Sequence, residues 1–290
     1  MMNTTLVVLA AGLGSRYGGF KQVDAIGPNG YSIMDYSLFD ALNVGFTSIV
    51  LVVQESMVEL LTDRYITQRN WPVRFAIQEK DVTVTGKTYS REKPWGTAHA
   101  LWCAKDEINT PFVLINADDF YGRESFRLAY NYLQSEAQPC AVLFPIEKTL
   151  SSNGTVNRAE ATINNGWLQT TVEREKISKA NDDIVYLSAE GKQKVLAKDS
   201  LVSMNMWGLT PDIFDFIDDD STDFIAQWQQ NPSIEYQLPT VIDAMIQQER
   251  FKVKALVTES NWVGVTYKSD KDEVRTQLQQ LHDKGIYDTI

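Results

Sequence analysis

The sequence predicts an α/β protein with a mixed, mainly parallel central sheet in a Rossmann-like three-layer αβα arrangement. Strand-like apolar runs alternate with helical patterns along the first half of the chain, a rhythm typical of parallel sheets covered by helices on both faces. The first run, Leu6–Ala11, is made of small and β-branched apolar residues, as expected of a strand buried on both faces. It leads directly into a glycine-rich segment, Gly12–Lys21.

The elements of the first half follow from periodicity. The strand-like runs are Leu6–Ala11, Thr47–Gln54, Val73–Gln78, Pro111–Asn116 and Cys140–Pro145, and the helical patterns between them are Ile33–Val44, Ser56–Tyr65 and Ala98–Ala104. The polar segment Lys80–Pro94 is expected to be a flexible loop over the site. Ligands of such sheets bind beyond the carboxyl ends of the strands, where the glycine-rich segment begins.

The second half has a different pattern. From Leu150, short strand-like segments separated by turns predict a small antiparallel β insertion across the mouth of the sheet, extending over residues 149–210. After it we expect a helix that begins at Pro211–Phe216, an acidic helix end at Asp218–Asp220 and an amphipathic helix at Tyr236–Gln248. An alternating edge strand at 251–257 and a polar helix at 271–284 complete the chain.

Composition limits the class of protein. The chain has 290 residues, of which 43% are hydrophobic, so it can bury a sizeable core. Its net charge of −11 argues against a nucleic-acid binder, which would present a basic face. It has no apolar stretch of about 18 residues that would predict a membrane span. Without a secretory leader pattern, and with Cys103 and Cys140 in apolar surroundings, a cytoplasmic location is expected.

The glycine-rich segment has the composition of a phosphate cradle. Glycines let several backbone N–H groups converge on an anion, and cations beside them add full positive charge. These residues are Gly12, Gly14, Gly18 and Gly19 with Ser15, Arg16 and Lys21. The dinucleotide fingerprint G-x-G-x-x-G is excluded by Tyr17, and the P-loop by the residues Phe20–Gln22 that follow Gly19.

The spacing L-A-A-G-x-G-S-R…K resembles the opening motif of the sugar nucleotidyltransferase family, which makes nucleotide-sugars from a sugar 1-phosphate and a nucleoside triphosphate. The resemblance implies that Arg16 and Lys21 act on the phosphates. It also implies that the nucleotide is bound by the segment that contains Leu9, Ala11, Gly12, Gly14 and Ser15.

Two adjacent carboxylates, Asp118 and Asp119, follow the strand Pro111–Asn116. A carboxylate beside a hydrophobic core is costly unless it has a partner. Mg²⁺ is a suitable partner because it prefers hard oxygen ligands. A local turn that ends the strand would also account for the two carboxylates. The segment resembles the family's G-D-x motif, which implies that Asp118 binds the metal. The family takes a second ligand from the C-terminal part of the domain, where Thr266 and Asp270 are the candidates; we assign Asp270.

Three further segments resemble substrate-binding motifs of the family. Gly96 and Thr97 match a G-T-[AG]-x-A segment that contacts the nucleotide, although a capped helix start has the same local sequence. By the same resemblance Gln78 is a candidate for the base edge. On the sugar side the candidates are Glu173 in a V-E motif and Asn205 in an N-x-[GW] motif, although a Glu in a charge-rich turn is often only solvated. Gly154 and Arg158 resemble the glycine-containing turn that closes over the sugar in the family.

The resemblance therefore implies a single nucleotidyltransferase domain over 1–290, with a nucleotide-binding half (1–148), a sugar-binding insertion (149–210) and C-terminal helices with an edge strand (211–290). The implied reaction is an Mg²⁺-dependent in-line displacement that joins a nucleoside triphosphate to a sugar 1-phosphate. The alternatives are a cytidylyltransferase for another phosphorylated small molecule such as phosphocholine, and a catalytically silent nucleotide-sugar sensor. A homo-oligomer is compatible with all three of these functions. We expect the loop 12–21 and Asp118 to face each other across one cleft.

Overall fold

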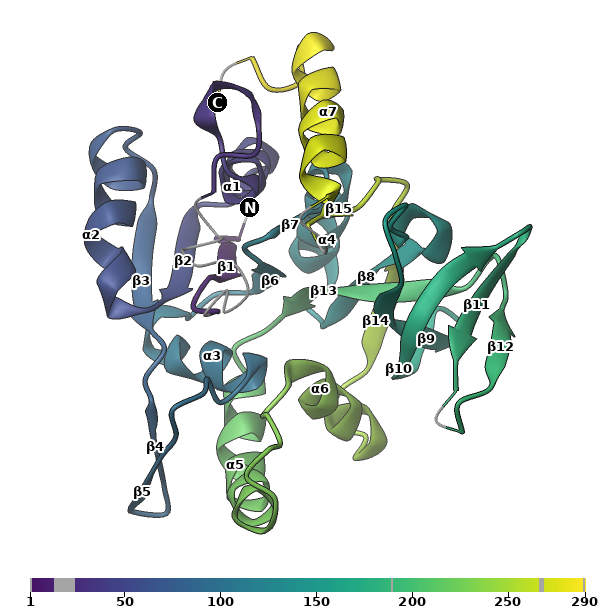
Figure 1. Cartoon of the computed structure of the whole chain (residues 1–290). Coiled ribbons are helices and arrows are strands. Elements are labelled where there is room, and N and C mark those ends of the chain that lie inside the picture. Colours follow the sequence, from purple (N-terminus) through teal and green to yellow (C-terminus); the bar gives the residue numbers. More distant parts are fainter. Residues whose placement is uncertain (1, 13–23, 189, 266–268, 289) are drawn as a thin grey trace.

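The computed structural model describes residues 2–12, 24–188, 190–265, 269–288 and 290, and it has a mixed α/β fold built on a central sheet, as predicted (Figure 1). The candidate residues Gly14, Ser15, Arg16, Lys21 and Thr266 lie outside the described residues. None of the described helices combines the length and hydropathy needed to cross a membrane.

The helices and strands have the following bounds. The strands are β1 (Thr5–Leu9), β2 (Ser48–Val53), β3 (Val73–Ile77), β4 (Asp81–Val84), β5 (Lys87–Ser90), β6 (Phe112–Asn116), β7 (Asp119–Phe120), β8 (Cys140–Pro145), β9 (Val156–Asn164), β10 (Trp167–Ala180), β11 (Asp183–Leu187), β12 (Gln193–Leu196), β13 (Leu201–Leu209), β14 (Val253–Val257) and β15 (Val263–Gly264). The helices are α1 (Ile33–Val44), α2 (Val58–Leu61), α3 (Thr97–Cys103), α4 (Arg123–Glu136), α5 (Ile213–Gln230), α6 (Leu238–Gln247) and α7 (Asp270–Asp283).

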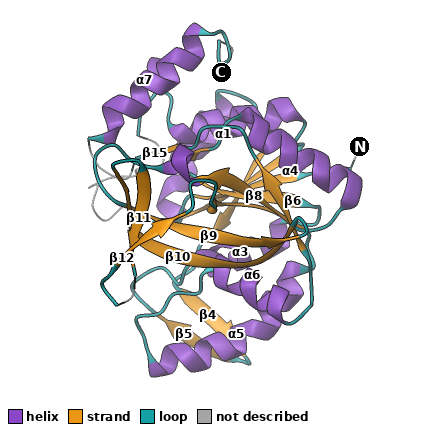
Figure 2. Ribbon diagram, turned by 90° about the vertical axis from the view of Figure 1, so that its right-hand side faces the viewer, coloured by secondary structure: helices purple, strands orange, loops and turns teal. Residues whose placement is uncertain are grey.

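The main sheet contains parallel and antiparallel pairs. Its strand order is β12-β11-β10-β14-β8-β13-β6-β1-β2-β3, with β9 paired to β10 and β13. The strands β6, β1, β2 and β3 run parallel to one another, whereas β13 runs antiparallel to both β6 and β8. The segment from β9 to β12 therefore extends the same sheet, and Figure 2 shows its long strands crossing in front of the helices that lie behind them.

The central strands of the sheet divide their side chains between two hydrophobic cores. In β1, Leu6 and Val8 pack in one core with α1 and α4, whereas Val7 packs in the other with α3, α5 and α6. This follows from the two-residue period of a strand, and it explains why the predicted runs are apolar at every position. Figure 1 shows α1 and α4 on one side of the sheet and α3, α5 and α6 on the other.

The local sequence explains where α1 begins and ends. Ser32 caps its first turn in a reciprocal capping box with Asp35, which accepts from the Ser32 backbone N–H at 2.6 Å. Gly45 ends the helix at φ 125°, a conformation that glycine adopts with little strain. The prediction of a helix over Ile33–Val44 is confirmed, as is that of the strand Cys140–Pro145.

The segment 80–94 was expected to be a flexible loop, and this was wrong. It contains the hairpin of β4 and β5, joined by Thr85 and Gly86 at φ 50° and 76°. Two successive residues with positive φ form the turn that suits the twist of a hairpin. Val82 and Val84 are buried in the core that contains α5, so packing holds the hairpin against that helix.

Two further expectations need correction. The acids Asp218–Asp220 do not end a helix but lie within α5, where Asp218 accepts from the Trp102 indole at 2.7 Å and pairs with Lys105. The strand expected at an edge, β14, pairs with β8 on one side and with Trp167 and Leu168 of β10 on the other. Its alternating pattern comes from partly covered sheet faces rather than from a free edge.

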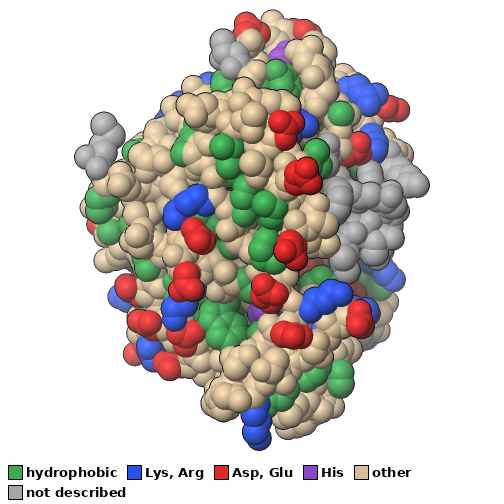
Figure 3. Space-filling model, turned by 90° about the vertical axis from the view of Figure 1, so that its left-hand side faces the viewer, with side chains coloured by type: hydrophobic (Ala, Val, Ile, Leu, Met, Phe, Trp, Pro, Cys, Tyr) green, Lys and Arg blue, Asp and Glu red, His purple; other side chains and the backbone are tan. Residues whose placement is uncertain are grey.

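Charged side chains are mixed on the face shown in Figure 3. Among the described residues of that face, acidic and basic side chains are interspersed and do not form a basic patch.

Candidate active site

The segment that leads to the glycine-rich loop and the segment that carries Asp118 leave the sheet side by side. Leu9 at the end of β1 is in register with Asn116 at the end of the neighbouring strand β6. Beyond that pair, the Ala117 N–H donates to the Leu9 carbonyl at 3.1 Å. Because these strands are parallel, the chain at Gly12 and the carboxylate of Asp118 emerge at the same edge of the sheet.

The backbone before the loop is tied to the next strand. Ala10 donates to the Val52 carbonyl at 2.8 Å, and the buried Ala11 carbonyl accepts from the Gln54 side chain at 2.9 Å. The entry to the loop is thus held in place up to Ala11.

A cavity of about 360 Å³ opens beside Asp118. Of the sequence-predicted residues, it brings together Asp118, Glu173 and Asn205, although they come from the β6–β7 segment, β10 and β13. Glu173 lies within β10, which continues beyond it to Ala180. Most of the groups around the cavity are polar, so it suits a ligand rich in hydrogen-bonding groups.

Asn205 interrupts β13 and links the cavity wall to the core. Its φ of 60° is in the left-handed region, and the pairing of β13 with β8 shifts register between Ser203 and Trp207. The Asn205 amide donates to Asn116 Oδ1 at 2.7 Å, and its oxygen accepts from the Trp207 indole at 2.8 Å. Both polar atoms of this half-buried amide therefore have protein partners.

The neighbouring carboxylate, Asp119, is held by a hydrogen-bond network. Asn116 Nδ2 donates to its Oδ2 at 2.9 Å, and the Tyr121 hydroxyl lies 3.3 Å from the same oxygen. Asp119 also pairs through its backbone with Gly264 in the short β7–β15 ladder. A Cβ at Gly264 would lie 2.4 Å from the Trp262 ring, so glycine is required for this close approach.

A buried arginine lies on the other side of the cavity. Arg158 is 8% exposed, and its guanidinium stacks over the Trp262 ring at 4.6 Å. It donates to the carbonyls of Asn157 at 2.8 Å and Thr149 at 2.6 Å, and its Nε has no hydrogen-bond partner among the described residues. Burial lowers the pKa of Arg158, and the charges of nearby carboxylates oppose this.

The charges of the cavity act on one another. Burial raises the pKa of Glu173, whereas the positive charge of Arg158 favours its ionised form. Asp119 and Glu173 in turn both favour the charged form of Arg158. A cation and several carboxylates around one cavity can orient a polyhydroxylated ligand through charge-assisted hydrogen bonds.

The candidates on the nucleotide side lie together at the start of α3. Gln78 donates to the Gly96 carbonyl at 3.2 Å. Thr97 accepts from the Leu238 N–H at 2.9 Å, and the Ala98 N–H donates to the Tyr236 carbonyl at 2.9 Å. The Thr97 hydroxyl and the Ala98 N–H at this helix start are therefore already bonded to the segment that begins α6. Fewer of its polar groups remain for a nucleotide than the sequence suggested.

Packing also accounts for the glycine at this helix start. Gly96 has φ 127°, and a Cβ there would lie 2.3 Å from the Tyr236 carbonyl oxygen. Glycine is needed for the close approach of the two backbones, whether or not a nucleotide binds there.

Among the predicted sugar-binding and metal-binding residues, Gly154 and Asp270 do not line the cavity. Gly154 is exposed in the turn that precedes β9. Asp270 is 5% exposed and lies in a separate hollow beside Ser151 and Glu273, where its carboxylate accepts from the Ser151 hydroxyl at 3.0 Å. Asp118 is not among the residues that line this hollow.

The donor set is compatible with magnesium. The described residues include no group of three or more His, Cys, Asp or Glu side chains that could hold a metal ion by themselves. Mg²⁺ usually binds through one or two carboxylates, with water and substrate phosphates as the other ligands. Asp118 on the cavity wall, with Asp119 beside it, meets this requirement.

Sequence reasoning missed Asn116, Tyr121 and Trp262. Asn116 could have been found as the one polar residue of an otherwise apolar strand that leads to two carboxylates. Nothing local distinguishes Tyr121 and Trp262, because their roles depend on contacts with β13 and with Arg158.

The chain resembles known proteins in sequence profile and in fold. The sequence profile of the nucleotidyl transferase family matches residues 6–265. No curated protein matches the chain by sequence.

Solved structures with the same fold include a UDP-glucose pyrophosphorylase complexed with UDP-glucose (TM-score 0.62, 16% identity, covering 98% of this chain and 100% of that chain). A putative glucose-1-phosphate thymidylyltransferase from Bacillus anthracis has a TM-score of 0.64 at 12% identity, covering 95% of both chains. The inositol-1-phosphate CTP transferase from T. maritima has a TM-score of 0.65 at 13% identity, covering 97% of this chain and 98% of that chain. At these identities, the similarity shows a shared fold.

Proposed function

The chain belongs to the nucleotidyl transferase family, a family of enzymes, and from this premise we propose that it joins a nucleoside triphosphate to a sugar 1-phosphate. A phosphate oxygen of the sugar 1-phosphate attacks the α-phosphorus. The bond from that phosphorus to the bridging oxygen of the β-phosphate breaks, and pyrophosphate leaves. A phosphate monoester is a competent nucleophile at neutral pH, so the protein has to bring two polyanions together and stabilise the transition state.

In this proposal, successive parts of the chain have different roles. Residues 1–148 form the nucleotide-binding half, with Arg16 and Lys21 on the phosphates and Gln78 near the base. Residues 149–210 act as the acceptor-binding insertion of a Rossmann-like three-layer fold, and 211–290 complete the core. The adjacent carboxyl ends of β1 and β6 support this proposal, because they bring the chain at Gly12 and the Asp118 carboxylate to one edge of the sheet.

Asp118 is the proposed magnesium ligand. When bound, the ion supplies charge neutralisation and Lewis-acid polarisation at the reacting phosphate. The carboxylate of Asp119, held by Asn116, keeps a second negative charge beside it.

The single observation that favours a sugar over phosphocholine is the stack of Arg158 on Trp262. Recognition of a quaternary ammonium group relies on open aromatic faces and on negative charge. Here the guanidinium lies 4.6 Å from the Trp262 ring centroid, so a cation would meet like charge at that aromatic wall. Hydroxyl groups, by contrast, find donors and acceptors in Arg158, Glu173 and Ser203 around the cavity.

The test is pyrophosphate release in the presence of Mg²⁺, with a panel of nucleoside triphosphates against sugar 1-phosphates and phosphocholine. We expect release with at least one sugar 1-phosphate, and a loss of about a hundredfold or more in turnover for Asp118→Asn. Asp182→Asn, at an exposed turn position, is the matched control and should keep full turnover.

Each other outcome rejects the proposal in a defined way. Release with phosphocholine alone would identify the cytidylyltransferase alternative. Binding of a nucleotide-sugar without any pyrophosphate release would identify a silent sensor. Full turnover in Asp118→Asn would remove the metal assignment.

A further inference from the structure

The first turns of α7 contact the turn that precedes β9. Asp270 Oδ1 accepts two hydrogen bonds from this turn, from the Ser151 hydroxyl at 3.0 Å and from Asn153 Nδ2 at 2.8 Å. One turn further along the helix, Glu273 Oε2 accepts from the Ser152 hydroxyl at 2.8 Å. The Asn153 N–H in turn donates to Ser151 Oγ at 3.0 Å, which closes the turn on itself. Carboxylates of α7 therefore determine the conformation of residues 151–153.

This turn leads directly to the cavity. It contains Gly154, and the chain then enters β9, which carries Arg158 on the cavity wall. Because Arg158 is stacked and buried, its position depends on where β9 begins. A displacement of the turn is transmitted to the acceptor side of the site.

The same turns of α7 also hold the segment that follows the glycine-rich loop. Lys271 Nζ donates to Asp24 Oδ2 at 2.6 Å, and Arg275 Nε donates to the Ile26 carbonyl at 3.3 Å. Residues 24–26 are the first described residues after the loop. Neighbouring side chains of one helix thus reach both flanks of the proposed site.

The helix itself is anchored firmly. Val274 and Leu278 are buried in a hydrophobic cluster with Ile26 and Val263. Further along, the His282 ring lies 2.9 Å from the Tyr36 hydroxyl of α1. Figure 1 shows α7 in yellow beside α1 and close to β7 and β15. A rigid element with contacts to both flanks can keep their separation constant.

We propose that the N-terminal turns of α7 form a brace between the acceptor-side turn, residues 151–154, and the exit of the phosphate loop, residues 24–26. Within it Asp270 is a positioning residue and does not bind the metal. The names of the two flanks rest on the proposed function, whereas the brace itself rests on the hydrogen bonds. The separate hollow of Asp270 and its two side-chain donors on one oxygen support this assignment.

Steady-state kinetics at varied Mg²⁺ concentration distinguishes the two roles. Asp270→Ala should raise the KM for the acceptor about tenfold, because two hydrogen bonds to the turn are lost. It should leave the Mg²⁺ concentration for half-maximal activity unchanged. In Asp270→Asn the KM for the acceptor should stay within about threefold of that of the original protein, because an amide oxygen still accepts both hydrogen bonds. Lys271→Met should raise the KM for the triphosphate instead.

The matched control is Asp272→Ala. It removes the same charge from the same helix turn, but its side chain is 93% exposed and pairs with Arg275 at 3.7 Å among the residues that the structure describes. Neither KM should change. An Asp270→Ala protein that needs more Mg²⁺ and keeps its acceptor KM would overturn the proposal, as would an Asp270→Asn protein as impaired as Asp270→Ala.

Hydrogen exchange of the unliganded protein tests the brace without any assay of activity. Asp270→Ala should speed exchange in residues 151–158 and Lys271→Met in residues 24–31, with melting temperatures close to that of the original protein. Unchanged exchange in both variants refutes the brace. A protein that releases no pyrophosphate with any substrate pair refutes the proposed function, and the exchange result still decides the brace.

Discussion

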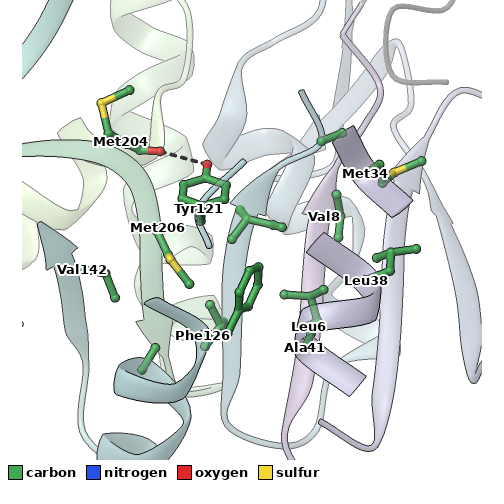
Figure 4. Packing of buried hydrophobic residues seen from close by; sticks show 14 of the residues in the cluster. Leu6, Val8, Met34, Leu38, Ala41, Tyr121, Phe126, Val142, Met204 and Met206 are labelled. Atoms are coloured by element: carbon green, nitrogen blue, oxygen red, sulfur yellow. Dashed lines mark hydrogen bonds between the residues drawn. The ribbon is translucent and has the colours of Figure 1, made fainter. Parts of the chain in front are cut away.

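The substitution Tyr121→Phe removes one hydroxyl that joins β6 to β13 at the point where their direct pairing stops. The ladder between these strands extends no further than Trp207. Beyond it, the Tyr121 hydroxyl accepts from the Asn116 N–H at 3.1 Å and donates to the Met204 carbonyl at 2.9 Å (Figure 4). The side chain takes the place of the missing strand-to-strand hydrogen bond.

The magnitude follows from the burial of these groups. Tyr121 is 0% exposed, so the phenylalanine ring would fill the same space and the backbone groups would lose their partner. An unsatisfied buried donor or acceptor costs about 1–3 kcal/mol. For the Asn116 N–H and the Met204 carbonyl together, the free energy of unfolding should fall by about 2–5 kcal/mol. In a chain of this size, that lowers Tm by on the order of 10 °C.

The assay is thermal and urea-induced unfolding of both proteins at the same pH. Tyr132→Phe is the matched control, because it makes the same chemical change at a partly exposed ring whose hydroxyl has no hydrogen-bond partner among the described residues. Its stability should stay within about 0.5 kcal/mol of the original protein. Equal stability of Tyr121→Phe and Tyr132→Phe would refute the bridging role.

Three further predictions concern other buried polar groups. Burial raises the pKa of Asp40 to about 6 against the opposing effects of Tyr287 and Arg123, so the folded protein binds this proton more tightly than the unfolded chain. The contribution of Asp40 to the free energy of unfolding should therefore decrease by up to about 3 kcal/mol as pH rises from about 4 to about 6, and the pH profile of Asp40→Asn should lack this component. For Asn205, with φ 60°, alanine should be less stable than glycine by about 1 kcal/mol in urea unfolding, because alanine adds backbone strain to the same loss of hydrogen bonds; equal values would contradict this. Arg158→Lys should raise the acceptor KM about tenfold and lower Tm, since lysine cannot reproduce the stacked, forked donor that also bonds the Thr149 carbonyl; an unchanged KM would remove Arg158 from the acceptor site.

The sequence by itself determined the parts that depend on local pattern. Continuous apolar runs specify β1, β2, β6 and β8, because a strand buried on both faces needs an apolar side chain at every position. The capping residues of α1 set its bounds in the same local way. That the segments leading to Gly12 and to Asp118 leave the same edge of the sheet also followed from sequence, because the carboxyl ends of parallel strands meet at one edge.

Tertiary structure alone decided which polar residues meet. Glu173 and Arg158 reach the cavity of Asp118 because β9 and β10 extend the main sheet, and no local period encodes that pairing. Asp270 was assigned as a ligand by resemblance to the family, and only the structure shows its carboxylate accepting a hydrogen bond from Ser151 in another hollow. Side chains that are far apart in the chain come together through packing and through the register of neighbouring strands. Packing and register exist only once the sheet has formed.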